Sequence, residues 1–129
     1  AYAAPVFLES EAKRALDEPA LRPVVSRPTA EAVLGMMRQV VTRGTGALAG
    51  ADGYEVAGKT GTAEKPRPDG YDPDRNVTSF TALFPATRPQ FVVLIVLDEA
   101  QPRTGQQRTA AYTSAAIAGR LIARIAPML

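Results

Sequence analysis

The chain has 129 residues, of which 46% are apolar and 22% are charged, a composition typical of one soluble globular domain or of a piece of a larger one. Its net charge of +2 comes from 15 basic and 13 acidic residues interleaved along the sequence, which does not favour nucleic-acid binding. Cysteine and histidine are absent, which excludes disulfides, thiolate metal sites and the commonest general base. We therefore expect no metal, no cofactor, and a chemistry that relies on Ser, Thr, Lys, Tyr or carboxylates.

Residues 1–25 have no clear assignment beyond a possible helix at Ser10–Leu16, and we treat them separately from a region that spans residues 26–129. That region begins with a predicted helix from Ser26 to Arg43, which Gly44-Thr45-Gly46 ends. The apolar residues of this helix recur at helical spacing and form one stripe: Val33, Met36, Met37, Val40 and Val41.

Three strands are predicted after this helix. The first, Tyr54–Ala63, contains glycines that would let another backbone or a ligand come close. Prolines, a glycine and charged residues then predict an exposed loop at Lys65–Asn76. The second strand is Val77–Phe84, and the link Pro85–Pro89 suits a hairpin. The third, Gln90–Leu97, holds an unbroken apolar run, as expected for a central strand covered on both faces.

A final helix is predicted from about Ala110 to Ala126, where it would cover one face of the sheet. Its apolar side carries Ile117, Leu121, Ile122 and Ile125, and its polar side carries Arg120 and Arg124. The expected fold class is therefore α+β, with an antiparallel sheet of at least three strands packed with N- and C-terminal helices.

One stretch satisfies two unrelated active-site patterns. Residues Gly53 to Thr60 spell G-x-x-x-x-G-K-T, the phosphate-binding P-loop, and the apolar run that ends in Asp98-Glu99 mimics an acidic Walker B strand. A P-loop needs a buried strand before it and a helix that begins at the Lys-Thr pair. Here Ala47–Asp52 is not an apolar strand, and glycines and prolines follow the lysine. Because these conditions are not met, we retain a small P-loop nucleotide-binding protein only as an alternative hypothesis.

The second pattern is Lys59-Thr60-Gly61, the K-T-G motif of penicillin-interacting serine enzymes. In a strand, Thr60 and Thr62 share one face, and Lys59 and Gly61 share the other. Two hydroxyls and the free amide of an edge strand can hold a carboxylate and a developing oxyanion, and an ammonium beside them supplies positive potential. Gly61 would permit close approach.

The motif does not stand alone. The order of segments along residues 24–129 closely resembles the C-terminal part of the class B penicillin-binding proteins, and most of all the cell-division transpeptidases that crosslink septal peptidoglycan. The segments that carry this resemblance are Val40–Gly46, Val56–Ala63, Ser79-Phe80, Phe84–Ala86, Phe91–Glu99 and Ile117–Leu129.

The resemblance implies a penicillin-binding/serine β-lactamase-like transpeptidase fold and an enzyme that crosslinks cell-wall stem peptides through a serine acyl-enzyme. Lys59 would be a catalytic residue, the backbone amide of Thr62 would complete the oxyanion hole, and Thr60, Gly61 and Thr62 would bind substrate. The implied ligands are the D-Ala-D-Ala end of a peptidoglycan stem peptide and β-lactams, and divisome proteins are the implied partners. The implied location is the periplasmic face of the bacterial inner membrane, with a membrane anchor in a part that is not in this sequence.

The serine nucleophile of that family belongs to an S-x-x-K motif. Ser10-Glu-Ala-Lys13 matches it, and on a helix Ser10 and Lys13 would share one face. However, family nucleophiles lie far upstream of K-T-G with an S-x-N motif between them, whereas the sole asparagine here, Asn76, follows Lys59. We interpret Ser10 as an ordinary helix-start or surface residue, leave the nucleophile unassigned, and expect the isolated chain to be inactive. A noncatalytic binding or assembly module on the same scaffold is a third hypothesis.

Overall fold

The computed structural model describes residues 23–101, 105 and 107–128. Residues 1–33 form one unit and residues 34–129 a second. Most of the unassigned segment 1–25, including Ser10, lies outside the described residues. Helix α2 (Arg27–Arg43) begins in the first unit, after Ser26, and its residues from Leu34 onward belong to the second. The Ser26 hydroxyl accepts a hydrogen bond from the Thr29 amide at 3.3 Å. Ser26 therefore caps the helix that the sequence predicts from this residue.

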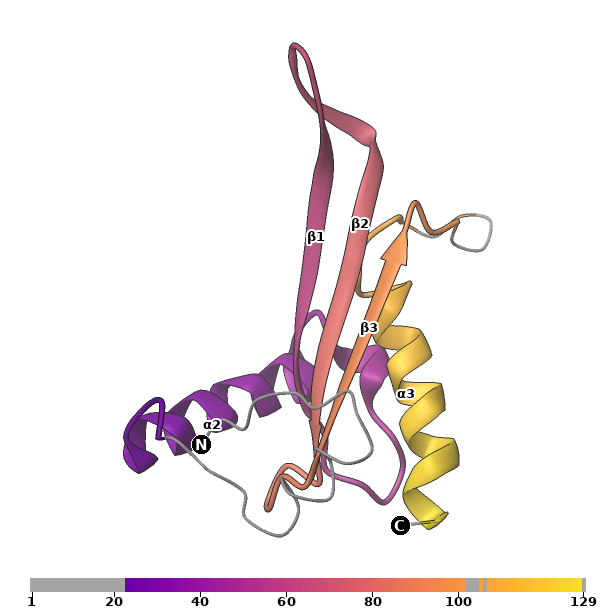
Figure 1. Cartoon of the computed structure of the whole chain (residues 1–129). Coiled ribbons are helices and arrows are strands. Elements are labelled where there is room, and N and C mark those ends of the chain that lie inside the picture. Colours follow the sequence, from indigo (N-terminus) through magenta and orange to yellow (C-terminus); the bar gives the residue numbers. More distant parts are fainter. Residues whose placement is uncertain (1–22, 102–104, 106, 129) are drawn as a thin grey trace, which may run out of the picture. The chain divides into compact units, whose positions relative to one another are not determined.

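The second unit is built on a three-stranded antiparallel sheet with the order β1-β2-β3 (Figure 1). The strands are β1 (Ala57–Arg67), β2 (Gly70–Phe84) and β3 (Phe91–Asp98). Helix α3 (Ser114–Ile125) packs on one face of β2 and β3, and two short 3-10 helices, η1 (Ala47–Ala49) and η2 (Ala126–Met128), adjoin it. The α+β fold class is confirmed.

The core lies between the sheet and α3, and small residues of the helix allow close contact. The residues of α3 that are buried are Ser114, Ala115, Ala118, Gly119 and Ile122. Of the four apolar residues predicted to face the sheet, Ile122 is fully buried, but Leu121 is 37% exposed. The helix therefore contacts the sheet through a narrower surface than the positions of its large side chains indicate, because Ile122 is flanked in the contact by the small residues Ala115, Ala118 and Gly119.

The exposed loop predicted at Lys65–Asn76 is wrong. β1 continues to Arg67 and turns at Pro68-Asp69 into β2, so the two strands form one long hairpin. Lys65 pairs with Asp72 after a register shift that follows Glu64, and residues 73–75 form the bulge. Proline is tolerated at bulges and on edge strands because its missing N–H breaks no ladder bond there. The pair Asp69-Gly70 was the hairpin signal in the sequence, and Gly70 adopts a φ of +139°.

The prediction that Gln90–Leu97 forms a central strand is also wrong within the described residues. β2 is central and β3 lies at an edge. Val93 and Ile95 pack against the core, whereas Val92, Leu94 and Val96 are 68%, 60% and 55% exposed. An unbroken apolar run thus has one covered face here and one open face.

Helix α2 shows a similar difference. The predicted stripe includes Met36, which is 60% exposed, and Val41 is the one residue of the helix that is buried among the described residues. The helix ends as predicted at the glycine pair, where the amides of Gly44 and Gly46 both donate to the Val40 carbonyl at 3.1 and 2.9 Å. These bonds satisfy a carbonyl that the helix itself leaves free.

An ion cluster fastens the hairpin to the end of β3. The Glu99 carboxylate accepts hydrogen bonds from Arg75 Nη2 at 2.6 Å and from Lys65 Nζ at 2.7 Å, and Lys65 also contacts Asp98 at 2.5 Å. Arg75 and then Lys65 lower the pKa of Glu99 to about 2. Asp98 and Glu99 raise the pKa of Lys65. Three segments that are distant in the sequence are therefore joined by charge.

Gly119 provides a direct test of the packing between α3 and η1. A Cβ at this position would overlap the Leu48 carbonyl oxygen and lie 3.0 Å from Ala49 Cα. We expect Gly119→Ala to reduce the free energy of unfolding by about 1–3 kcal/mol, because backbone atoms would have to move. The matched control is Gly35→Ala in α2, where a Cβ meets nothing within 4 Å. This substitution should increase the free energy of unfolding by roughly 0.5–1 kcal/mol. Urea denaturation measures both changes. Equal effects of the two substitutions would show that the contact is not tight.

The ion cluster predicts a pH-dependent contribution of Glu99 to stability. Its pKa of about 2 in the folded chain lies below the ordinary glutamate value of 4.5, so the stabilisation is complete above about pH 4.5 and is lost as the pH falls towards 2. The Tm of Glu99→Gln should therefore lie below that of the wild type at pH 7, and the difference should narrow between pH 4.5 and 2. Asp69→Asn, which removes an exposed pair with Arg67, is the control and should change Tm little. A difference that stays constant down to acid pH would contradict the prediction.

Candidate functional site

The residues Lys59-Thr60-Gly61-Thr62 lie in the first half of β1, which is an edge strand within the described part of the chain. Thr60 pairs with Phe80 and Thr62 with Thr78, and both partners are fully buried on the face that α3 covers. The predicted alternation is therefore confirmed. Both threonines point to the α3 face, and Lys59 and Gly61 point to the other.

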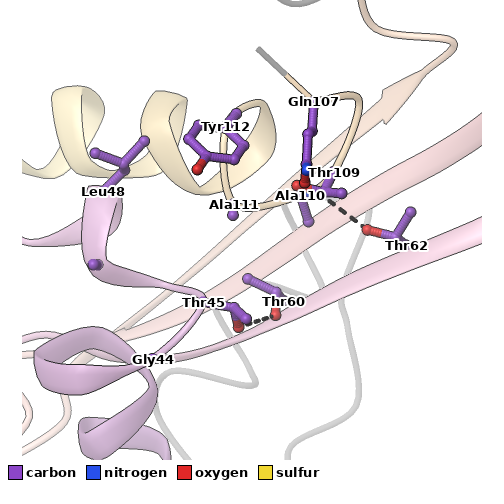
Figure 2. Close-up of a pocket in the computed structure, with 11 residues that line it drawn as sticks. Gly44, Thr45, Leu48, Thr60, Thr62, Gln107, Thr109, Ala110, Ala111 and Tyr112 are labelled. Atoms are coloured by element: carbon purple, nitrogen blue, oxygen red, sulfur yellow. Dashed lines mark hydrogen bonds between the residues drawn. The ribbon is translucent and has the colours of Figure 1, made fainter.

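A cavity of about 760 Å³ opens beside the two threonines (Figure 2). It is bounded by β1, by the turn after α2 with η1, and by the segment that precedes α3. Its lining residues from these elements are Thr60 and Thr62, then Gly44, Thr45, Ala47 and Leu48, and then Gln107 and Thr109 to Tyr112. Threonine hydroxyls thus face an open space that mixes apolar and hydrogen-bonding groups, which is typical of a ligand site.

Both threonine hydroxyls of β1 have a protein partner. The Oγ1 atoms of Thr60 and Thr45 are 2.7 Å apart, and Thr62 Oγ1 accepts a hydrogen bond from the Ala110 amide at 3.1 Å (Figure 2). An amide can only donate, so the proton of the Thr62 hydroxyl remains available to another acceptor. The Thr62 hydroxyl can therefore donate to a ligand, whereas the hydrogen bond between Thr45 and Thr60 can run in either direction.

Lys59 is exposed and does not line this cavity. Its Nζ atom donates a hydrogen bond of 2.5 Å to the carbonyl oxygen of the next residue, Thr60. Gly61 lies opposite Ser79, and a Cβ at Gly61 would lie 2.6 Å from Ser79 Oγ. The close approach that we expected of Gly61 is therefore made by a neighbouring strand of the same sheet.

The wall formed by residues 107–112 was missed in the sequence, because only the fold brings it beside β1. Besides the bond from the Ala110 amide to Thr62, three side-chain hydrogen bonds hold this connection and the adjoining Thr113 to the hairpin. Asn76 Nδ2 donates to the Arg108 carbonyl at 2.8 Å, Arg108 Nη1 donates to the Asp74 carbonyl at 2.6 Å, and Thr113 Oγ1 donates to Thr78 Oγ1 at 2.9 Å. Asn76 is 8% exposed, so its amide is a structural partner of this wall. A buried polar residue in a predicted loop had no sequence signal to reveal this role.

The structure excludes the P-loop hypothesis. Lys59 and Thr60 lie within β1, which continues to Arg67, so no helix begins at these residues to direct its amides to a phosphate. Gly53 adopts a φ of +80° in the turn that an isolated bridge between Ala51 and Tyr54 closes. Glu99, which completes the Walker B mimic, is bound to Arg75 and Lys65. The G-K-T letters are therefore a coincidence of a turn followed by a strand.

Within residues 23–101, 105 and 107–128, none of the helices combines the length and the hydropathy that crossing a membrane requires. His, Cys, Asp and Glu side chains nowhere gather in threes at metal-ligand distances in this part of the chain.

Comparison with known proteins gives a consistent result. Residues 1–123 match the family described as the penicillin binding protein transpeptidase domain. The chain is 40% identical, over 126 residues that cover 86% of it, to a probable peptidoglycan D,D-transpeptidase FtsI of Caulobacter vibrioides. The apo transpeptidase domain of penicillin-binding protein 3 from Burkholderia pseudomallei has a TM-score of 0.71 and 32% identity, covering 83% of this chain and 32% of that one.

A third relative is a complex. Penicillin-binding protein 3 of Mycobacterium tuberculosis, solved with ampicillin, has a TM-score of 0.61 and 37% identity, covering 78% of this chain and 25% of that one. The chain spans about a fifth of the curated Caulobacter relative, 21% of its length. The family match and the similarity to the Caulobacter protein both extend over most of the chain, and the chain therefore belongs to the penicillin-binding protein transpeptidase domain family, with relatives of the class B type that includes FtsI and penicillin-binding protein 3.

Proposed function

We propose that this chain forms the K-T-G wall of the active site of a peptidoglycan D,D-transpeptidase, which crosslinks cell-wall stem peptides through a serine acyl-enzyme. The observation that carries the proposal is the placement of Lys59 to Thr62 on an edge strand whose two threonine hydroxyls face a cavity of about 760 Å³. The catalytic serine is to be supplied by another part of the polypeptide, because no S-x-N motif and no convincing S-x-x-K motif occur in these 129 residues.

The threonines are suited to bind the substrate carboxylate. A carboxylate only accepts hydrogen bonds, so its partners have to present protons. Thr62 Oγ1 already accepts from the Ala110 amide, which leaves its proton free, and Thr60 lies on the same face two residues away. Hydrogen bonds from hydroxyls to a charged carboxylate are about twice as strong as neutral ones. We assign the C-terminal carboxylate of a D-Ala-D-Ala peptide, or that of a β-lactam, to this pair.

The backbone of β1 is suited to stabilise an oxyanion. The Thr60 carbonyl accepts a hydrogen bond from the exposed Lys59 ammonium, which indicates that it faces the open edge of β1 rather than β2. Backbone groups of a strand alternate in direction with a period of two residues, so the Thr62 amide points to the same edge. We assign this amide to the oxyanion hole, where a fixed donor stabilises the negative charge that develops in acyl transfer.

Lys59 is suited to supply charge beside this edge. Its ammonium lies 2.5 Å from the Thr60 carbonyl, so it is anchored next to the groups assigned to the carboxylate and the oxyanion. Its positive potential gains strength when a bound substrate excludes water. We assign to Lys59 the catalytic role of stabilising negative charge and tuning proton transfer around the serine.

The remaining elements of the proposal rest on the relatives. Ampicillin is bound in the related Mycobacterium tuberculosis protein, which supports β-lactams as ligands of the present site. Relatives are named as peptidoglycan D,D-transpeptidases of the FtsI type, which supports a stem peptide as substrate. We further propose a location at the periplasmic face of the bacterial inner membrane and divisome proteins as partners.

The first test is acylation of the full-length protein that contains this chain. Lys59→Ala should lower the second-order rate constant for acylation by a fluorescent penicillin by about 100-fold or more, because a preorganised charge at the reacting centre is lost. Lys65→Ala is the matched control, since Lys65 lies in the same strand but binds Asp98 and Glu99 at 2.5 and 2.7 Å. It should lower Tm and leave acylation within a few-fold of wild type. Equal rates for the wild type and Lys59→Ala would refute the assigned role.

The second test uses the isolated 129-residue chain. We expect no one-to-one covalent adduct after incubation with penicillin, because the chain can polarise an acyl group but has no assigned nucleophile. Intact-protein mass spectrometry measures this directly, with the full-length protein as the positive control. An adduct that maps to Ser10 would show that our interpretation of Ser10 is wrong. Absence of an adduct on the full-length protein would favour a noncatalytic module instead.

A further inference from the structure

The turn between α2 and η1 brings one hydroxyl to the K-T-G strand. Gly44 and Gly46 both donate their amides to the Val40 carbonyl at 3.1 and 2.9 Å, and the Ala47 amide donates to the Gly44 carbonyl at 3.2 Å. Three backbone hydrogen bonds therefore fix the turn on either side of Thr45. Thr45 itself is exposed at the cavity rather than buried in the core.

The same turn is pressed against the sheet. A Cβ on Gly46 would lie 3.1 Å from Phe80 Cε2, so the turn backbone packs directly on the Phe80 ring. Phe80 is fully buried and is the cross-strand partner of Thr60. The position of Thr45 relative to Thr60 is therefore fixed by a packed contact as well as by the turn, and their Oγ1 atoms lie 2.7 Å apart.

The direction of this hydrogen bond decides what Thr60 can do. A threonine hydroxyl has one proton and two acceptor positions. If Thr45 donates to Thr60, the Thr60 proton is free to bind a carboxylate, and a hydroxyl that accepts one hydrogen bond becomes a stronger donor in the next. The neighbouring Thr62 already has this arrangement, because the Ala110 amide fills one of its acceptor positions.

We propose that Thr45 is a positioning residue that donates to the Thr60 hydroxyl and thereby directs the Thr60 proton to the carboxylate of the substrate. Thr45 and the Ala110 amide then act in parallel, each orienting one threonine of the strand. This role rests on the proposed function, since it requires that Thr60 binds a carboxylate.

The test compares Thr45→Val, which removes the hydroxyl at nearly constant shape, with Thr45→Ser, which keeps it. In the full-length protein, Thr45→Val should raise the dissociation constant of the penicillin complex that precedes acylation about 3- to 10-fold. The maximal acylation rate should change little. Acylation by the methyl ester of the same penicillin, which has no carboxylate, should be unaffected. Thr45→Ser should restore most of the affinity.

Two controls separate this role from a structural one. Thr42→Val changes an exposed threonine of the last turn of α2. It should leave acylation by the penicillin and by its methyl ester at the wild-type level. In a Thr60→Val background, Thr45→Val should cause no further loss, because the hydroxyl that it orients is gone. This second comparison is made between two variants that both lack Thr60 Oγ1, so it holds even where Thr45→Val lowers stability.

Different outcomes would contradict the positioning role of Thr45 and the proposed function. Wild-type affinity in Thr45→Val, equal losses with the penicillin and its ester, or an undiminished loss in the Thr60→Val background would each overturn the positioning role. Failure of penicillin to acylate the wild-type full-length protein, or equal acylation of Lys59→Ala, would overturn the proposed function itself.

Discussion

Burial of the Phe80 ring is the constraint on which the K-T-G wall depends. The ring is fully buried and lies across Gly58, where an added Cβ would come 2.9 Å from Phe80 Cε1 and 2.8 Å from the Thr81 carbonyl oxygen. It also touches the turn at Gly46. Neither glycine can carry a side chain unless the ring moves, and interiors packed at this density resist such movement. Contact with the Phe80 ring therefore explains why a glycine, Gly58, stands before Lys59 in the apparent phosphate-binding pattern.

The outer part of the hairpin is held by polar contacts instead. Glu99 joins Arg75 and Lys65, while Asn76 and Arg108 tie the connection before α3 to β2. Because that connection forms one wall of the cavity and donates the Ala110 amide to Thr62, the polar contacts and the apolar core position opposite sides of the same site. The cavity thus depends on two sets of interactions that respond differently to salt and to acid. Both conditions weaken ion pairs, whereas they leave the packing of Phe80 nearly unchanged.

The sequence predicted those features that local patterns determine. Strand alternation was enough to place Thr60 and Thr62 on one face, and the glycine pair was enough to end α2. Composition misled at residues 65–76, because prolines and charges that are typical of a loop are also compatible with a bulged edge hairpin. It misled again at β3, since an apolar run does not reveal how many of its faces are covered. Thr45 and Ala110 could not be predicted, because their contacts with β1 depend on tertiary packing of distant segments.

The side chains of the proposed site lie on both faces of β1. Thr60 and Thr62 line the cavity on one face. Lys59 lies on the other face, where it pairs with Thr81 and Thr81 pairs with Leu94. Leu94 is 60% exposed, so an apolar side chain on this face is open in the described residues. Lys59 reaches from it around the free edge to the Thr60 carbonyl. Under the proposed function, the hydroxyl protons, the Thr62 amide and the ammonium meet only along this free edge. An attacking serine therefore has to approach β1 from the side opposite β2, where the substrate carbonyl can lie between the serine and the Thr62 amide.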